Sequence, residues 1–252
     1  MGKNNKSGED FKPNDNSAYI YQRPKLKEKD ELKIKSYPWT PNQQRIIDCI
    51  LSKESKIILI AGSAGTGKSV ISTYCGLFLL GVKRILSDYL FLRSPLECSD
   101  SSGMGYIPGQ ISEKFQPYAQ VFEDKLEELL QKNSIEILKN DNRLHACPTN
   151  YLRGSTIAAK YCHVEECQSL TFGELKLILS RYGSHSKMVL CGDPNYQSDL
   201  PKNKQGAFLT IFNTFDNQES RDKGIFCFKL EKEDIKRSDI TAFLLDKLES
   251  IK

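Results

Sequence analysis

The sequence predicts an α/β fold in which helices cover both faces of a mostly parallel sheet. Apolar runs typical of buried strands alternate with amphipathic stretches of helical spacing. The runs at 56–60 and 187–191 each begin with a lysine and are apolar after it, as expected of strands buried on both faces. Such alternation is typical of parallel sheets, whose ligands bind at the carboxyl ends of the strands.

The expected elements follow from local patterns. Strands are expected at 56–60, 89–92, 161–164, 187–191 and 225–230. Helices are expected from Pro41, over 70–80 and 117–131, from Thr171, and from Ser238. Thr171 and Glu174 match a capping box, and Gly81 and Gly183 are placed to end helices. Residues 139–148 are polar and lack a period, which predicts a loop.

Length and composition predict one folded domain behind a tail. The chain has 252 residues, 39% of them hydrophobic, which is sufficient for a substantial core. Residues 1–36 are rich in Lys, Asn, Asp and Glu, so we expect a flexible charged tail there and the domain at 37–252. The net charge of +4 permits contact with nucleic acid without requiring it.

The sequence has no apolar run long enough to cross a bilayer and no apolar stretch behind its first residues. We therefore expect no membrane partner, no signal peptide and a reducing compartment. The 8 cysteines are then not expected to form disulfides. Cys162 and Cys167 are spaced too widely for a C-x-x-C zinc pair, which favours scattered buried thiols over a metal site.

One motif carries clear chemistry. Residues 62–69 match G-x-x-x-x-G-K-[ST] in full, between an expected strand and an expected helix. The motif consists of Gly62, Ser63, Ala64, Gly65, Thr66, Gly67, Lys68 and Ser69. In such a P-loop the amides and the positive helix end hold phosphates. Lys68 is expected to reach the β- and γ-phosphates, and the Ser69 hydroxyl to bind Mg2+. The motif therefore predicts binding of a nucleoside triphosphate with magnesium.

Hydrolysis also needs a carboxylate for magnesium and a group that orients the attacking water. Glu165 and Glu166 directly follow the expected strand 161–164. A second candidate is Asp193 behind strand 187–191, with Gln197 close by. If these residues have no catalytic role, Glu165 and Glu166 form an ordinary acidic turn, and the residues behind Asp193 form an ordinary Pro-Asn turn.

The spaced motifs resemble those of a known family. The P-loop is followed by Tyr106–Gly109, Tyr151–Thr156, Glu165–Ser169, and Gly192–Asp193 with Gln197–Pro201. This is the order found in PhoH-like proteins, which the chain resembles from about Pro41 onward. These are predicted ATPases with a core similar to superfamily-one helicases. The resemblance implies a RecA-like P-loop NTPase fold, ATP as the nucleotide and a cytoplasmic setting.

The resemblance also implies roles for single residues. Gln43 corresponds to an adenine-reading glutamine, Glu165 to the Walker B aspartate that binds magnesium directly or through water, and Glu166 to the catalytic glutamate. Gln197 corresponds to a γ-phosphate sensor and Arg237 to an arginine finger. Arg153, beside Gly154, matches a signature pair without a mechanical role. Because the chain holds one core where a helicase has two, Arg237 is expected to act in trans in a homo-oligomeric ring, such as a hexamer.

Some positions depart from the family pattern. Glu165 is one methylene longer than aspartate beside a metal with strict geometry. Cys167 replaces a small apolar residue, Ser94 separates Arg93 from Pro95, and 139–146 resembles an insertion.

Three functions stay open at this point. The first is an ATPase coupled to work on RNA or single-stranded DNA, where the nucleic acid is implied by resemblance alone. The second is a nucleotide-binding switch or scaffold with little turnover, which Glu165 favours. The third is a P-loop nucleoside kinase of the thymidine-kinase type, a class that often has paired zinc cysteines, which this chain lacks.

Overall fold

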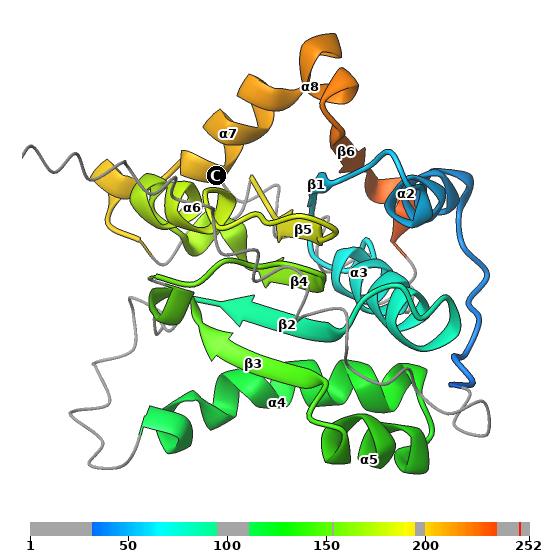
Figure 1. Ribbon diagram of the computed structural model, residues 1–252. Coiled ribbons are helices and arrows are strands. Elements are labelled where there is room, and N and C mark those ends of the chain that lie inside the picture. Colours follow the sequence, from blue (N-terminus) through cyan, green and yellow to red (C-terminus); the bar gives the residue numbers. More distant parts are fainter. Residues whose placement is uncertain (1–31, 95–110, 153, 195–199, 236–246, 248–252) are drawn as a thin grey trace, which may run out of the picture.

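A computed structural model describes residues 32–94, 111–152, 154–194, 200–235 and 247. Its six strands form one sheet in the order β3-β2-β4-β5-β1-β6, and every strand pair is parallel (Figure 1). The strands are β1 Ile57–Gly62, β2 Asp88–Arg93, β3 Leu144–Pro148, β4 Lys160–Glu165, β5 Lys187–Gly192 and β6 Ile225–Leu230. This sheet confirms the predicted α/β class.

Helices cover both faces of the sheet. They are α2 Pro41–Leu51, α3 Lys68–Leu77, α4 Ile111–Leu129, α5 Lys132–Asn140, α6 Phe172–Leu179, α7 Ala207–Phe215 and α8 Gln218–Asp222. Ile58 and Ile60 of β1 pack in a core with α2 to α5, whereas Ile57 and Leu59 pack in a second core with α6 and α7. Side chains of a strand alternate between its faces, so a strand covered on both sides must be apolar throughout.

The expected loop at 139–148 is wrong. The segment contains the end of α5 and the whole of β3, which pairs with β2 at the edge of the sheet. Four of the five residues of β3 are only half-buried. An edge strand of this kind does not need a continuous apolar run, so its sequence carries a weak signal. Helices α5, α7 and α8 were also not predicted.

Residues 32–36, which were expected to belong to the tail, include two that contact the domain. Leu32 is 3% exposed and belongs to the core, and the Lys35 amide donates to the Leu129 carbonyl at 2.9 Å. Gly81 does not end a helix as expected, because it lies within a π-helical turn, η2 (Phe78–Val82). A Cβ at Gly81 would lie 2.1 Å from Leu32 Cδ1, so glycine is required here by the packing of Leu32.

Other helix ends also shifted. The capping box at Thr171 is confirmed, but α6 ends at Leu179, before Gly183. Helix α4 begins at Ile111, earlier than expected. The helix expected from Ser238 lies outside the described residues.

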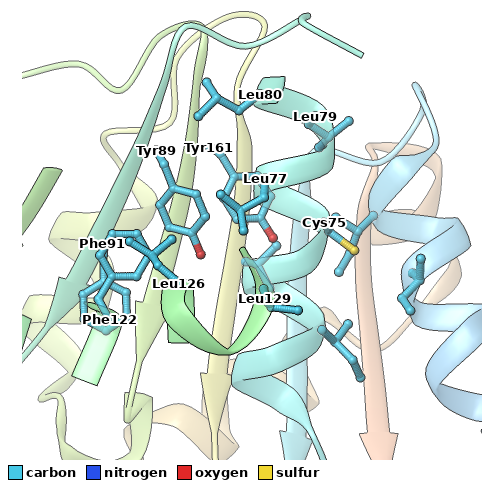
Figure 2. Close-up of a cluster of buried hydrophobic side chains, with 14 of the residues drawn as sticks. Cys75, Leu77, Leu79, Leu80, Tyr89, Phe91, Phe122, Leu126, Leu129 and Tyr161 are labelled. Carbon is cyan, nitrogen blue, oxygen red and sulfur yellow. The ribbon is translucent and has the colours of Figure 1, made fainter. Parts of the chain in front are cut away.

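Helix α3 packs closely on the sheet through Gly76. A Cβ there would lie 2.4 Å from Tyr89 Cε2 and 2.6 Å from Tyr161 Cδ1. Figure 2 shows both tyrosine rings beside this helix. Each tyrosine hydroxyl has its own polar partner. The Tyr161 hydroxyl donates to the Ser72 carbonyl at 2.8 Å, and the Tyr89 hydroxyl lies 2.7 Å from His163 Nδ1. The contact fixes the height of the P-loop helix above β2 and β4.

Gly76→Ala is therefore expected to destabilise the domain. An added methyl group in this contact should lower the free energy of unfolding by about 1–3 kcal/mol, the usual cost of overpacking. Urea unfolding followed by circular dichroism measures it. Gly173→Ala in α6 is the matched control, because a Cβ there lies 4.0 Å from the nearest atom, Thr171 Oγ1. Equal stability of the two variants would contradict the close packing of α3.

Two further observations bear on the class of protein. Among the described residues, no helix combines the length and the apolar character needed to cross a membrane. The seven cysteines of the described part are free thiols, and burial raises the pKa of each. The predicted scattered thiols are thus found in four buried and three half-buried positions.

Candidate nucleotide site

The P-loop joins the carboxyl end of β1 to the start of α3. Gly65 and Gly67 have φ values of 87° and 93°, in the left-handed region that glycine adopts at little cost. Gly67 is the N-cap of α3, so the loop ends directly on the N-terminus of a ten-residue helix. The unpaired amides and the positive dipole end of such a helix attract phosphate.

The side chains of the loop hold its shape. Lys68 Nζ donates to the carbonyls of Gly62 at 2.7 Å and Ser63 at 2.9 Å. The Thr66 hydroxyl donates to the Ser63 carbonyl at 2.8 Å. The ammonium group therefore lies over the loop itself, next to the amides that would hold phosphate.

Glu165 lies next to this loop, although β5 separates its strand from β1. It ends β4, and its carboxyl interacts with the Ser69 hydroxyl and the Lys68 ammonium. Burial raises the pKa of this carboxyl, but His163, Ser69 and Lys68 together outweigh that effect, so the pKa lies below its usual value. The site thus holds an ionised carboxylate and a hydroxyl within reach of each other.

His163 is a site residue that the sequence prediction missed. Its Nε2 lies 2.7 Å from Glu165 Oε1, and both side chains are buried. The sequence did contain a signal for it. A histidine interrupts an apolar strand two residues before Glu165, and residues two apart in a strand lie on the same face of the sheet.

His163, Glu165 and Cys191 offer potential ligand atoms within 4.8 Å of one another, which raises the question of a metal. The 2.7 Å contact between His163 and Glu165 is shorter than the edge of about 3.3 Å that zinc–ligand lengths imply for a tetrahedral site. The contact is therefore that of a pair of side chains rather than of two ligands of one zinc ion.

Gln168 connects the ends of two strands. Its Nε2 donates to Glu166 Oε2 at 2.5 Å, and its Oε1 accepts from the Asp193 amide at 3.0 Å. Glu166 itself has left-handed backbone angles, φ 52° and ψ 45°, where the chain turns into η4 (Cys167–Ser169). The Gln168 side chain thus links the Glu166 carboxylate to the backbone of Asp193, a role that the motif did not reveal.

Gln43 is buried and its amide is fully engaged with the protein. Its Oε1 accepts from the Thr40 amide at 3.0 Å in a capping box of α2. Its Nε2 donates to the carbonyls of Thr66 at 2.9 Å and Asp234 at 3.0 Å. Gln43 therefore ties the P-loop to α2 and to the segment behind β6, and both its amide hydrogens are used within the protein.

Gln43→Ala is expected to lower the free energy of unfolding without nucleotide by about 1–3 kcal/mol, because two buried carbonyls lose their donor. Thermal unfolding measures it, with Gln44→Ala as control, since the Gln44 side chain bonds Asp48 at an exposed position. Unchanged stability with a selective loss of ATP over GTP would instead support the adenine-reading role implied by the resemblance.

Several residues expected at the site lie outside the described part of the chain. These are Gln197, Arg237, Arg153 and Tyr106–Gly109. Their roles stay predictions.

A cavity of about 970 Å3 lies away from this site. Its lining includes residues at or just before the starts of strands, such as Lys56, Ser87, Ala159 and Lys187, and none of the P-loop. Nucleotides bind such sheets at the opposite, carboxyl edge, so this cavity is not assigned to the nucleotide.

The parallel sheet and the loop between β1 and α3 define a P-loop nucleotide-binding protein of the α/β class. A family model described as PhoH-like protein matches residues 35–249. The chain therefore belongs to the PhoH-like family, which confirms the resemblance drawn from its motifs.

Individual relatives agree with this assignment. Protein PhoH2 from Thermobispora bispora is 33% identical over 170 residues, which are 67% of this chain and 39% of that protein. The PhoH-like protein from Bacillus subtilis is 27% identical over 194 residues, covering 77% of this chain and 58% of that protein. The matched part is thus well short of the full length of either relative.

Solved structures are more distant. The Pif1 helicase from Candida albicans matches with a TM-score of 0.41 at 14% identity, over 85% of this chain and 44% of that one. The SWI2/SNF2 ATPase core from Sulfolobus solfataricus matches with a TM-score of 0.42 at 13% identity, over 79% and 46%. Likenesses of this extent assign no activity.

Proposed function

We propose that this chain binds ATP with Mg2+ at the P-loop and hydrolyses it. The observation that carries the proposal is the complete P-loop at the start of α3, with the Glu165 carboxyl beside Ser69. The hydroxyl of Ser69 and the carboxylate of Glu165 are the hard oxygen ligands that Mg2+ prefers. When bound, magnesium would neutralise charge on the β- and γ-phosphates.

The chain's own groups bind the phosphates and activate the attacking water. The amides of the loop and the end of α3 bind the phosphates, and the Lys68 ammonium turns from the loop carbonyls to the β- and γ-phosphates. Glu166 orients the attacking water and accepts its proton, and Gln168 holds the Glu166 carboxylate at 2.5 Å beside Asp193. Gln197 completes the site as a sensor of the γ-phosphate.

The work that hydrolysis drives is proposed to be remodelling of RNA or single-stranded DNA. Membership of the PhoH-like family and the net charge of +4 support this. Steady-state hydrolysis with Mg2+ should be measured with and without single-stranded RNA and DNA, with Lys68→Ala as blank. A hydrolysis rate that rises with RNA or with DNA identifies that nucleic acid as the partner. A rate that neither nucleic acid changes removes the nucleic acid from the proposal.

We further propose a homo-oligomer, such as a hexameric ring, in which Arg237 completes the site of a neighbouring subunit. Arg237→Ala should then lower turnover and leave affinity nearly unchanged. Mixing Arg237→Ala with Lys68→Ala should restore part of the activity, because some interfaces then combine an intact P-loop with an intact arginine. A monomeric mass at full activity with nucleotide present would contradict this arrangement.

A second candidate function is a nucleotide-dependent switch with little turnover. The observation that favours it is Glu165, a longer carboxylate than aspartate that is already engaged by His163. If the wild type binds Mg2+ and ATP tightly but hydrolyses ATP no faster than Glu166→Gln, the protein is better described as a switch.

A further inference from the structure

His163 is a polar side chain inside an apolar layer. It lies in β4, which is buried on both faces, and 1% of its side chain is exposed. The ring packs edge-on against Phe91, with centroids 5.4 Å apart and planes at 86°. A buried imidazole is costly unless its nitrogens have partners, so what it contacts indicates why it is there.

Both nitrogens face specific groups. The Tyr89 hydroxyl lies 2.7 Å from Nδ1, and Glu165 Oε1 lies 2.7 Å from Nε2. Among the described residues, neither Nε2 nor Oε1 forms a hydrogen bond of regular geometry, so the 2.7 Å contact between them is an ion-pair type of contact in buried surroundings. Tyr89 is in turn fixed, because its ring is fully buried against Tyr161 and Phe122.

The length of Glu165 explains the need for such a partner. A glutamate has one more rotatable bond than an aspartate, so its carboxylate must be held to present an oxygen at a defined place. The same carboxyl interacts with Ser69 at the P-loop, whose hydroxyl is the expected magnesium ligand. His163 thus contacts the carboxyl of a residue that also reaches the nucleotide site.

We infer that His163, oriented by Tyr89, is a positioning residue that holds the carboxylate of Glu165 at the magnesium site. The inference rests on the proposed function. The Tyr89 hydroxyl lies 2.7 Å from Nδ1 of the ring, and Glu165 Oε1 lies 2.7 Å from Nε2. With His163 beside it, Glu165 can present its carboxylate at the position where the family has the shorter aspartate.

The first test is the Mg2+ requirement of nucleotide binding and hydrolysis. His163→Leu should raise the Mg2+ concentration for half-maximal hydrolysis by about 10-fold or more, the usual effect of losing a residue that orients a metal ligand. Binding of a fluorescent ATP analogue in EDTA should not change. His163→Gln, whose amide nitrogen can replace Nε2 as donor, should recover part of the loss, and Tyr89→Phe should show a smaller loss.

The decisive test repeats His163→Leu in a Glu165→Asp background. The shorter side chain ends about 1.5 Å before the glutamate carboxylate and cannot keep the contact. There the histidine substitution should change the Mg2+ requirement less than 2-fold, as a double-mutant cycle of coupled residues predicts. Equal effects in both backgrounds, or no effect of His163→Leu beside Glu165, would overturn the inference.

The same series separates this inference from the proposed function. If the wild type binds without turnover, the Mg2+ dependence of analogue binding replaces the rate in every comparison. A wild type that binds nucleotide no better than Lys68→Ala would sink the proposed function and the inference with it. A wild type that responds to Mg2+ while His163→Leu matches it would sink the inference alone.

Discussion

Lys68→Ala is expected to abolish tight binding of ATP. The ammonium lies over the P-loop, bonded to the carbonyls of Gly62 and Ser63, and is the one side-chain cation that the motif places at the β- and γ-phosphates. Losing a charge-assisted bond to phosphate should weaken binding on the order of 100-fold. Titration with a fluorescent ATP analogue measures the loss, and hydrolysis should fall to background.

The control for Lys68→Ala is Lys53→Ala, which removes an exposed ammonium between α2 and β1, before the strand rather than after it. Its affinity for the nucleotide should equal that of the parent. Thermal unfolding without nucleotide checks that Lys68→Ala is still folded. If folded Lys68→Ala keeps the parental affinity for the nucleotide, the nucleotide binds at a site other than the P-loop.

Glu166→Gln is expected to bind Mg2+ and ATP like the parent but to hydrolyse about 10²–10⁴-fold more slowly, because only the group that takes the proton of the water is lost. The glutamine has the same size, and its carbonyl can still accept from Gln168 Nε2, which bonds Glu166 at 2.5 Å. Parallel measurements of single-turnover hydrolysis and of analogue binding separate the two effects.

Glu136→Gln, at an exposed position of α5, serves as the matched control and should hydrolyse normally. If Glu166→Gln instead hydrolyses at the parental rate, the general base lies elsewhere. Asp193 would then be the next candidate, because Gln168 joins it to the same site.

The sequence was sufficient where local patterns decide the structure. Five of the six strands were predicted, four of them because a strand buried on both faces must be apolar along most of its length, as β1, β2, β4 and β5 are. The P-loop was predicted because its glycines and its lysine occupy fixed positions around one turn. Both edge strands are half-buried, but β6 begins with an apolar run at 225–228, whereas β3 directly follows the polar residues 139–143 and was therefore missed.

The site was predictable only in part, because some of its contacts join distant residues. Tyr89 and His163 are 74 positions apart, and Gln43 and Asp234 are 191 apart. No spacing rule connects such pairs, so the partners of His163 and the bonds of Gln43 come from the packed structure alone. Glu165 was assigned by resemblance, and the structure adds what contacts it.

The most direct test of the central claim is steady-state hydrolysis of ATP with Mg2+ by the full chain, measured beside Lys68→Ala and Glu166→Gln. We expect turnover that requires Mg2+ and that falls to background in both variants. A rate that is the same in all three proteins would show that the P-loop of this chain does not hydrolyse ATP, and would contradict the proposed function.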